Sequence, residues 1–128
     1  MTLEGAAAEV SFGVWFPQVL AADWRHDVSL FGGDTVVVLI RHAESPHGLT
    51  ILQRAAGRPP EGWDWEDPEP LEPLDHGGEQ VFVQRRTSET RESRVRLERE
   101  GTYVELSSAS LPLEALLGLV GSLRPVRR

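Results

Sequence analysis

Hydrophobic and polar positions alternate along most of the chain, which predicts β-strands that each bury one face. The alternation begins with Val10, Phe12, Val14 and Phe16, and Pro17 closes this first strand. The β-branched run at 35–40 is typical of a central strand. The other predicted strands span Trp24–Phe31, 48–52, 80–86, 92–99 and 102–107. Gly32-Gly33-Asp34 and Glu100-Gly101 have the composition of hairpin turns.

Helical patterns are confined to the two ends of the chain. Residues 2–10 favour a short helix. Near the C-terminus, Ser110 is suited to an N-cap, Pro112 to the first turn and Pro125 to the end of a helix. Apolar residues recur between them at helical spacing, at Leu113, Leu116, Leu117, Val120 and Leu123. Strands clustered ahead of one helix predict an α+β fold, a mostly antiparallel sheet of six to seven strands packed by this amphipathic helix.

Residues 58–78 interrupt the alternation. This stretch holds five of the nine prolines, and Arg58 is its only positive residue. Because proline cannot donate a hydrogen bond to a sheet, a central strand is not expected here. The prediction is a long acidic, proline-rich loop inside a single domain that spans 1–128.

Composition limits the classes of function. The net charge of −7 opposes nucleic-acid binding, which needs a basic surface. No apolar run approaches the ~20 residues that span a bilayer, and the N-terminus lacks the pattern of a signal peptide. The chain has no cysteine, and all 13 positive residues are arginine, which suggests the codon usage of a GC-rich genome. We expect either a cytoplasmic protein or a soluble part of a longer exported or anchored protein.

Three segments resemble a known family. They are EVSFGVWFPQVLAADWR near the start, VVVLIR with GLTILQR in the middle, and GTYVELSSASLPLEALLGLVGSLRPV at the end. Together they are similar to a bacterial domain of unknown function that occurs at the extracytoplasmic end of some anti-sigma factors and lipoproteins. In the family's L-P-x-G-W motif this chain has Leu20-Ala21-Ala22-Asp23-Trp24, without proline or glycine. The resemblance implies a non-catalytic sensory or interaction domain and carries over no catalytic residue.

An Arg-His pair after a hydrophobic strand offers an enzymatic alternative. Arg41 and His42 are similar to the strand-end signature of histidine phosphatases, with His42 as the nucleophile and Arg41 binding phosphate oxygens. His76 resembles the second histidine of that family. Only 33 residues separate the two histidines, however, and a strand pair precedes the motif, both of which argue against the phosphatase fold.

A metal site is a weaker alternative. His42 and Glu44 would share a face if the strand continued, and His47 follows closely. His26 or His76 would complete the set. A turn rich in His and Glu is commoner than a metal site, so no metal or other cofactor is expected.

Two groups of residues are candidates for binding a partner. The acidic loop interleaves Trp63 and Trp65 with Asp64, Glu66 and Asp67, a pattern suited to a basic, partly apolar protein or peptide. Arg94 and Arg96 would share one exposed face of a strand, where they could hold an acidic chain. The alternatives are tryptophans that fold back onto the sheet, and arginines that pair with glutamates at 89, 92, 98 and 100.

The sequence therefore favours a non-enzymatic sensory or protein-interaction domain. The resemblance links it to anti-sigma or envelope signalling. The expected partner is a protein or peptide, with no nucleic acid and no direct insertion into a membrane. The oligomeric state cannot be derived from the pattern.

Overall fold

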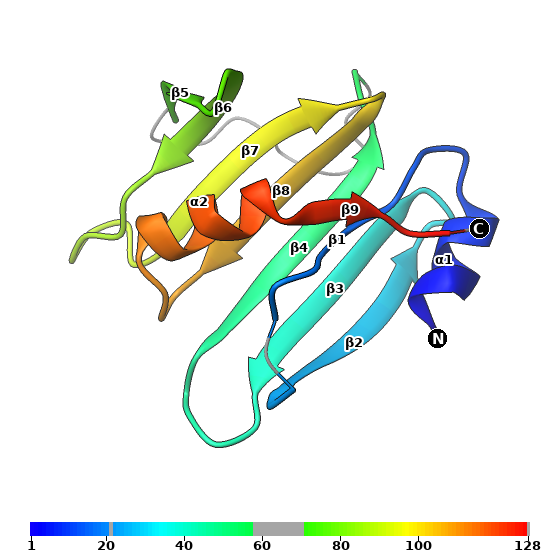
Figure 1. Ribbon diagram of the computed structural model, residues 1–128, viewed down its shortest axis with the longest axis horizontal. Helices are drawn as coiled ribbons and strands as arrows, with labels where there is room; N and C mark the ends of the chain where they lie inside the picture. The colour runs from blue at the N-terminus through cyan, green and yellow to red at the C-terminus, as the bar shows by residue number, and fades with distance from the viewer. Residues whose placement is uncertain (21, 58–70, 128) are drawn as a thin grey trace.

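The computed structural model describes residues 1–20, 22–57 and 71–127, which form an α+β domain with two antiparallel sheets (Figure 1). The helices are α1 (Leu3–Glu9) and α2 (Leu113–Gly121). The strands are β1 (Trp15–Pro17), β2 (Trp24–Phe31), β3 (Thr35–His42), β4 (Gly48–Ala55), β5 (Glu72–His76), β6 (Glu79–Gln84), β7 (Ser93–Arg99), β8 (Thr102–Ser108) and β9 (Leu123–Pro125). The larger sheet has seven strands in the order β2-β3-β4-β8-β7-β6-β5. The predicted fold class is confirmed.

One face of the larger sheet is covered. Helix α2 crosses β7 and β8, and the β1–β9 ribbon continues this layer over the other strands (Figure 1). Alternate strand residues point into the space between the layers and form the core with the apolar side of α2. Their fully buried members include Val36, Val38, Ile51, Val81, Val95, Val104, Leu106 and Leu116.

Polar side chains join the N-terminal segment to the sheet. The side-chain amide of Gln53, which is fully buried, accepts a hydrogen bond from the backbone N–H of Trp15 (2.7 Å) and donates one to its carbonyl (2.8 Å). The hydroxyl of Thr102 donates to the carbonyl of Gly13 (2.5 Å). These bonds fix the path of a segment that has few ladder partners of its own.

The predicted first strand at 10–16 is mostly wrong. Helix α1 begins after Thr2, whose hydroxyl accepts from the N–H of Gly5 (2.9 Å), and only the last residues of the segment form β1. Val10, Phe12 and Val14 are buried at alternate positions as predicted. Alternation therefore predicted their burial but not their hydrogen bonding, because no described strand pairs with residues 10–14. The carbonyl of Val14 accepts instead from the N–H of Val126 (2.7 Å), just after β9.

The C-terminal helix is shorter than predicted. Pro112 is its N-cap, whereas the hydroxyl of Ser110 accepts from the N–H of Gly48 (3.1 Å). The helix ends at Gly121, and Leu123 is buried from strand β9 rather than from the helix. No helix among the described residues is long and apolar enough to cross a membrane.

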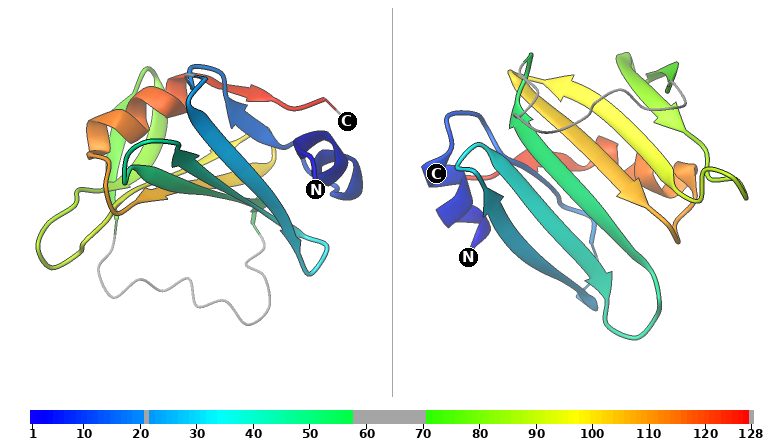
Figure 2. Two further views of the ribbon diagram at one scale, coloured as in Figure 1. Left: turned by 90° about the horizontal axis from the view of Figure 1, so that it is seen from below. Right: turned by 180° about the vertical axis from the view of Figure 1, so that it is seen from behind.

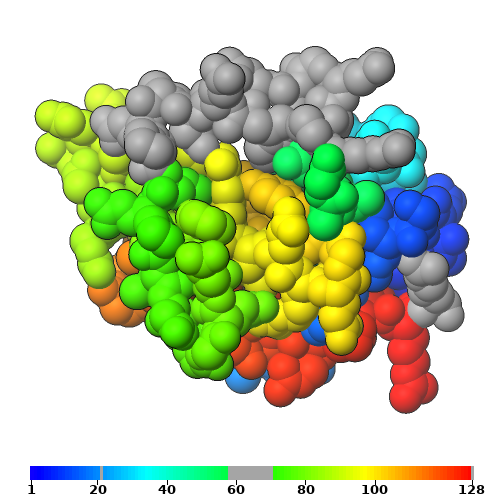
Figure 3. Space-filling view, turned by 90° about the horizontal axis from the view of Figure 1, so that it is seen from above, coloured from blue at the N-terminus to red at the C-terminus, as the bar shows by residue number. Residues whose placement is uncertain are grey.

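The predicted loop at 58–78 contains a strand. Residues 58–70 lie outside the described residues, but Glu72–His76 form β5, which pairs with β6 at one edge of the sheet. Pro73 is compatible with this strand because, among the described strands, β5 has a neighbour on one side only. The Arg99 guanidinium contacts the Glu79 carboxylate through two hydrogen bonds (2.6 and 3.1 Å) and ties β6 to β7. Figure 3 shows the β5–β6 hairpin beside β7 on this side of the molecule.

Candidate functional site

The larger sheet has a second face, opposite α2 and the β1–β9 ribbon, as both views in Figure 2 show. The strand register puts on it the alternate residues that do not face the core. Many of these residues are charged, and arginines outnumber the acidic residues near the centre. From β2 across to β6 the charged and aromatic members are Arg25, Asp27, Phe31, Arg41, Arg54, Tyr103, Glu105, Glu98, Arg96, Arg94 and Phe82.

Arg94 and Arg96 share one carboxylate in the middle of the second face. Nη2 of Arg94 and Nε of Arg96 each donate to Oε1 of Glu105, both at 2.7 Å. The side chains of the three residues are only 12–16% exposed. The prediction that both arginines lie on one face is right, but that face is partly buried there. Among the described residues, both arginines pair with Glu105 and not with the glutamates at 89, 92, 98 and 100.

Arg54 and Tyr103 lie beside this cluster on β4 and β8. The Arg54 guanidinium carbon is 4.4 Å from the centre of the Tyr103 ring, a cation–π contact. Burial lowers the pKa of Arg54 from its ordinary value. Burial also raises the pKa of Tyr103, and the negative charge of Glu105 adds to this. Tyr103 is thus a neutral phenol at pH 7.

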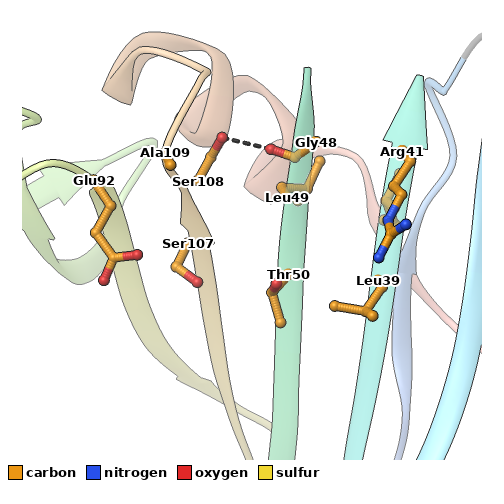
Figure 4. Close-up of a pocket in the computed structure, with 10 residues that line it drawn as sticks. Leu39, Arg41, Gly48, Leu49, Thr50, Glu92, Ser107, Ser108 and Ala109 are labelled. Atoms are coloured by element: carbon orange, nitrogen blue, oxygen red, sulfur yellow. Dashed lines mark hydrogen bonds between the residues drawn. The ribbon is translucent and has the colours of Figure 1, made fainter. Parts of the chain in front are cut away.

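The second face is hollowed at the end where β3 stops and β4 begins (Figure 4). The hollow has a volume of about 300 Å³ and is lined by Leu39 and Arg41 from β3, by residues of β4, and by Ser107 and Glu92. Arg41 and Glu92 stand at its two sides, with Thr50 and Ser107 between them (Figure 4). An exposed guanidinium, hydroxyls and an apolar wall make the hollow suited to an extended polar chain.

The three residues of the phosphatase alternative do not come together. Arg41 and His42 end β3, whereas His76 ends β5, and four strands lie between β3 and β5. At the usual spacing of strands this separation is about 24 Å. His76 pairs with Glu79 and so lies at the opposite end of the sheet. The neighbours of β3 are both antiparallel.

His42 has structural contacts on both ring nitrogens. Nε2 lies 2.5 Å from Oδ2 of Asp23, and Nδ1 accepts a hydrogen bond from the N–H of Glu44 (3.2 Å). The edge of the ring meets Trp24 at 5.1 Å between ring centres. These contacts hold the start of β2 against the end of β3. A nucleophilic histidine needs one nitrogen open to the substrate, which His42 does not offer in this arrangement.

The predicted metal ligands are not arranged around a common point. Strand β3 ends at His42, so Glu44 lies in the following turn and does not share a strand face with it. His47 contributes its backbone carbonyl to the N–H of His42 (3.0 Å). Within 1–20, 22–57 and 71–127, no group of three His, Asp or Glu side chains is placed to hold one ion.

The predicted loop contacts Trp63, Asp64, Trp65, Glu66 and Asp67 lie outside the described residues. Sequence reasoning missed Arg54, Tyr103 and Glu105 as members of the site. Arg54 could have been found by continuing the alternation of the strand at 48–52 to residue 55, where β4 ends.

Comparisons of the chain with models of protein families, with curated proteins and with solved structures found no match.

Proposed function

We propose that this protein is a non-enzymatic interaction domain that binds an acidic segment of a partner protein on the second face of its sheet. The observation that carries the proposal is the concentration of guanidinium groups there, in a chain whose net charge is −7. Arg94 and Arg96 share the carboxylate of Glu105, and Arg54 lies beside them over the ring of Tyr103. Guanidinium groups bind carboxylates in a directional, two-point manner.

The hollow adds an exposed arginine, Arg41, to the guanidinium groups of the second face. Arg41 is exposed and makes no ion pair with another described residue. Leu39 provides apolar contact beside it. Phe31 is 54% exposed and Phe82 is 41% exposed on the outer parts of the same face. Exposed aromatic rings around charged residues are typical of surfaces that bind proteins.

A sensory role forms the wider part of the proposal. The resemblance to the domain found at the extracytoplasmic end of anti-sigma factors supports it, because such a domain would act by holding or releasing a partner. The acidic loop, with Trp63 and Trp65 at its centre, is a second predicted contact, suited to a basic partner.

Binding of short synthetic peptides tests the proposal. We expect a fluorescent peptide rich in Asp, Glu and Trp to bind, and a peptide with Asn and Gln in place of its acids to bind much less. Arg41→Gln should weaken binding of the acidic peptide about tenfold, since one charged hydrogen bond contributes about 1.5–3 kcal/mol. Arg124→Gln is the matched control, because Arg124 is exposed on β9, over the opposite face.

Two further measurements distinguish binding at the second face from binding at the acidic loop: binding of a basic peptide, and binding by a variant that lacks residues 61–69. The deletion ends before Glu72, where β5 begins, so it leaves that strand intact. If the acidic and neutral peptides bind equally, or if Arg41→Gln and Arg124→Gln behave alike, the second face is not the binding surface. Binding of the basic peptide that is lost only in the deletion would assign recognition to the loop instead.

A further inference from the structure

Strand β2 leaves one side of its backbone open. Among the strands that the structure describes, it is the outermost of the larger sheet and pairs only with β3. The carbonyl of Asp23 accepts from the N–H of Ala43 (2.8 Å), so odd-numbered residues direct their backbone groups toward β3. Because the direction alternates, Trp24, His26, Val28 and Leu30 direct theirs outward. No described residue forms a backbone hydrogen bond with these outward groups.

The two edges of the sheet differ in how well they resist pairing. Edge strand β5 has Pro73, which interrupts its row of donors. Edge strand β2 has eight residues and no proline or glycine. Helix α1 lies near the C-terminal end of β2 in Figure 1 and in the right view of Figure 2, and no described element runs along the open side of the first part of the strand. This part of β2 can therefore accept a further strand.

We propose that the open edge binds a second copy of this chain, with the two β2 strands antiparallel and His26 opposite His26 of the second copy. This inference goes beyond the proposed function and does not depend on it. In this register Arg25 lies opposite Asp27 of the second copy, and Asp27 lies opposite its Arg25. Both side chains are exposed, both point to the second face, and neither has an ion-pair partner among the described residues.

The charges select this register over its neighbours. A shift of one residue would put the core side of one strand beside the second face of the other, which a half-buried strand does not tolerate. Centring the pair on Asp27 would put two Asp27 carboxylates directly opposite each other. Centring it on Arg25 would do the same with two guanidinium groups. Like charges directly opposite are destabilising, and opposite charges stabilise the pair.

The core side of the strands also matches in this register. Trp24 would lie opposite Val28 of the second copy, and Val28 opposite its Trp24. Trp24 is half-buried and Val28 is buried against the core, so the contact continues the apolar layer of each copy. A contact through one short strand belongs among small interfaces, below about 1,200 Å². We therefore expect reversible association that depends on concentration.

Sedimentation equilibrium of the full chain and of charge variants tests this pairing. Wild type should dimerise, and Arg25→Asp and Asp27→Arg should each raise the dissociation constant at least about tenfold, because two attractive pairs become repulsive. The double variant with both changes should recover dimerisation, because the charges are exchanged but still opposite. Glu89→Arg, in an exposed turn away from β2, is the control for a change in net charge.

Mixing the two single variants gives the decisive measurement. The Arg25→Asp variant has an aspartate at both positions 25 and 27, and the Asp27→Arg variant has an arginine at both. The mixture should therefore form heterodimers, although each variant alone is monomeric. The proposal is overturned if wild type is monomeric at every concentration. It is also overturned if the Arg25→Asp and Asp27→Arg variants dimerise as tightly as wild type. That result would locate the interface elsewhere.

Discussion

The same strands build two faces that exclude water by different means. On the face under α2, Val95, Val104 and Leu106 are fully buried in the hydrophobic core. On the second face, Arg94, Arg96 and Glu105 are also largely hidden from solvent, but they are charged, and both arginines donate hydrogen bonds to Glu105. The covered face stabilises the fold by burying apolar side chains. On the second face, burial of the charged side chains is tolerated only because their hydrogen bonds and ion pairs are satisfied.

Truncation of Leu106 should lower the free energy of unfolding the most, since it leaves a cavity at the centre of the core under α2. Leu106 is fully buried on β8, beside Ile51 and Val95. We expect Leu106→Ala to lower the free energy of unfolding by about 2–5 kcal/mol, measured by urea denaturation. Ser107→Ala, at the next position but on the second face, should change it by less than about 0.5 kcal/mol. Similar losses in the two variants would contradict the difference between the faces.

Removal of Glu105 should have an intermediate effect, because it takes away the carboxylate that two guanidinium groups share. We expect Glu105→Ala to cost about 1–3 kcal/mol of unfolding free energy. Glu105→Gln, which keeps the size and one oxygen acceptor, should cost less. If both substitutions are neutral, the ion pairs of Arg94 and Arg96 contribute nothing to the fold, and this face is held by other contacts.

The smallest effect should come from the ionisation of Tyr103, the only tyrosine of the chain. Burial raises its pKa above the ordinary value of about 10. The folded protein therefore keeps this proton at a pH where the unfolded chain loses it, so stability should fall as pH rises above about 10. Absorbance of tyrosinate reports the titration of this residue alone.

Tyr103→Phe is the control for that measurement. It removes the ionisable group, so the loss of stability at high pH should be shallower than in wild type. A tyrosinate titration at the ordinary pKa in the folded protein would mean that the phenol is open to water, contrary to the burial that raises the pKa of Tyr103.

Alternation in the sequence predicted most of the sheet. Strands β2, β3, β4, β7 and β8 lie where the pattern puts them, within a few residues at their ends. The turn at Glu100-Gly101 also holds, with both residues at positive φ (48° and 82°), as a tight hairpin requires. These features are local, because side-chain period and turn composition act between neighbouring residues.

Features that depend on distant partners were not predictable in this way. Strand β5 has a proline and few apolar residues, and it forms because β6 offers a free edge. Strand β9 continues the leucine stripe of the helix, and it forms because β1 lies beside it. In both cases a neighbour in space, and not the local pattern, supplies the hydrogen bonds.

The candidate site divides in the same way. The sequence by itself determined that Arg94 and Arg96 share a face, that apolar residues of the last helix are buried, and that the chain is α+β, because each follows from the period of its own element. Only the tertiary structure decided that Glu105 joins the two arginines, that Arg54 lies over Tyr103, and that His42 and His76 are far apart. Those relations depend on the order of strands in the sheet, which brings together residues that no local pattern connects.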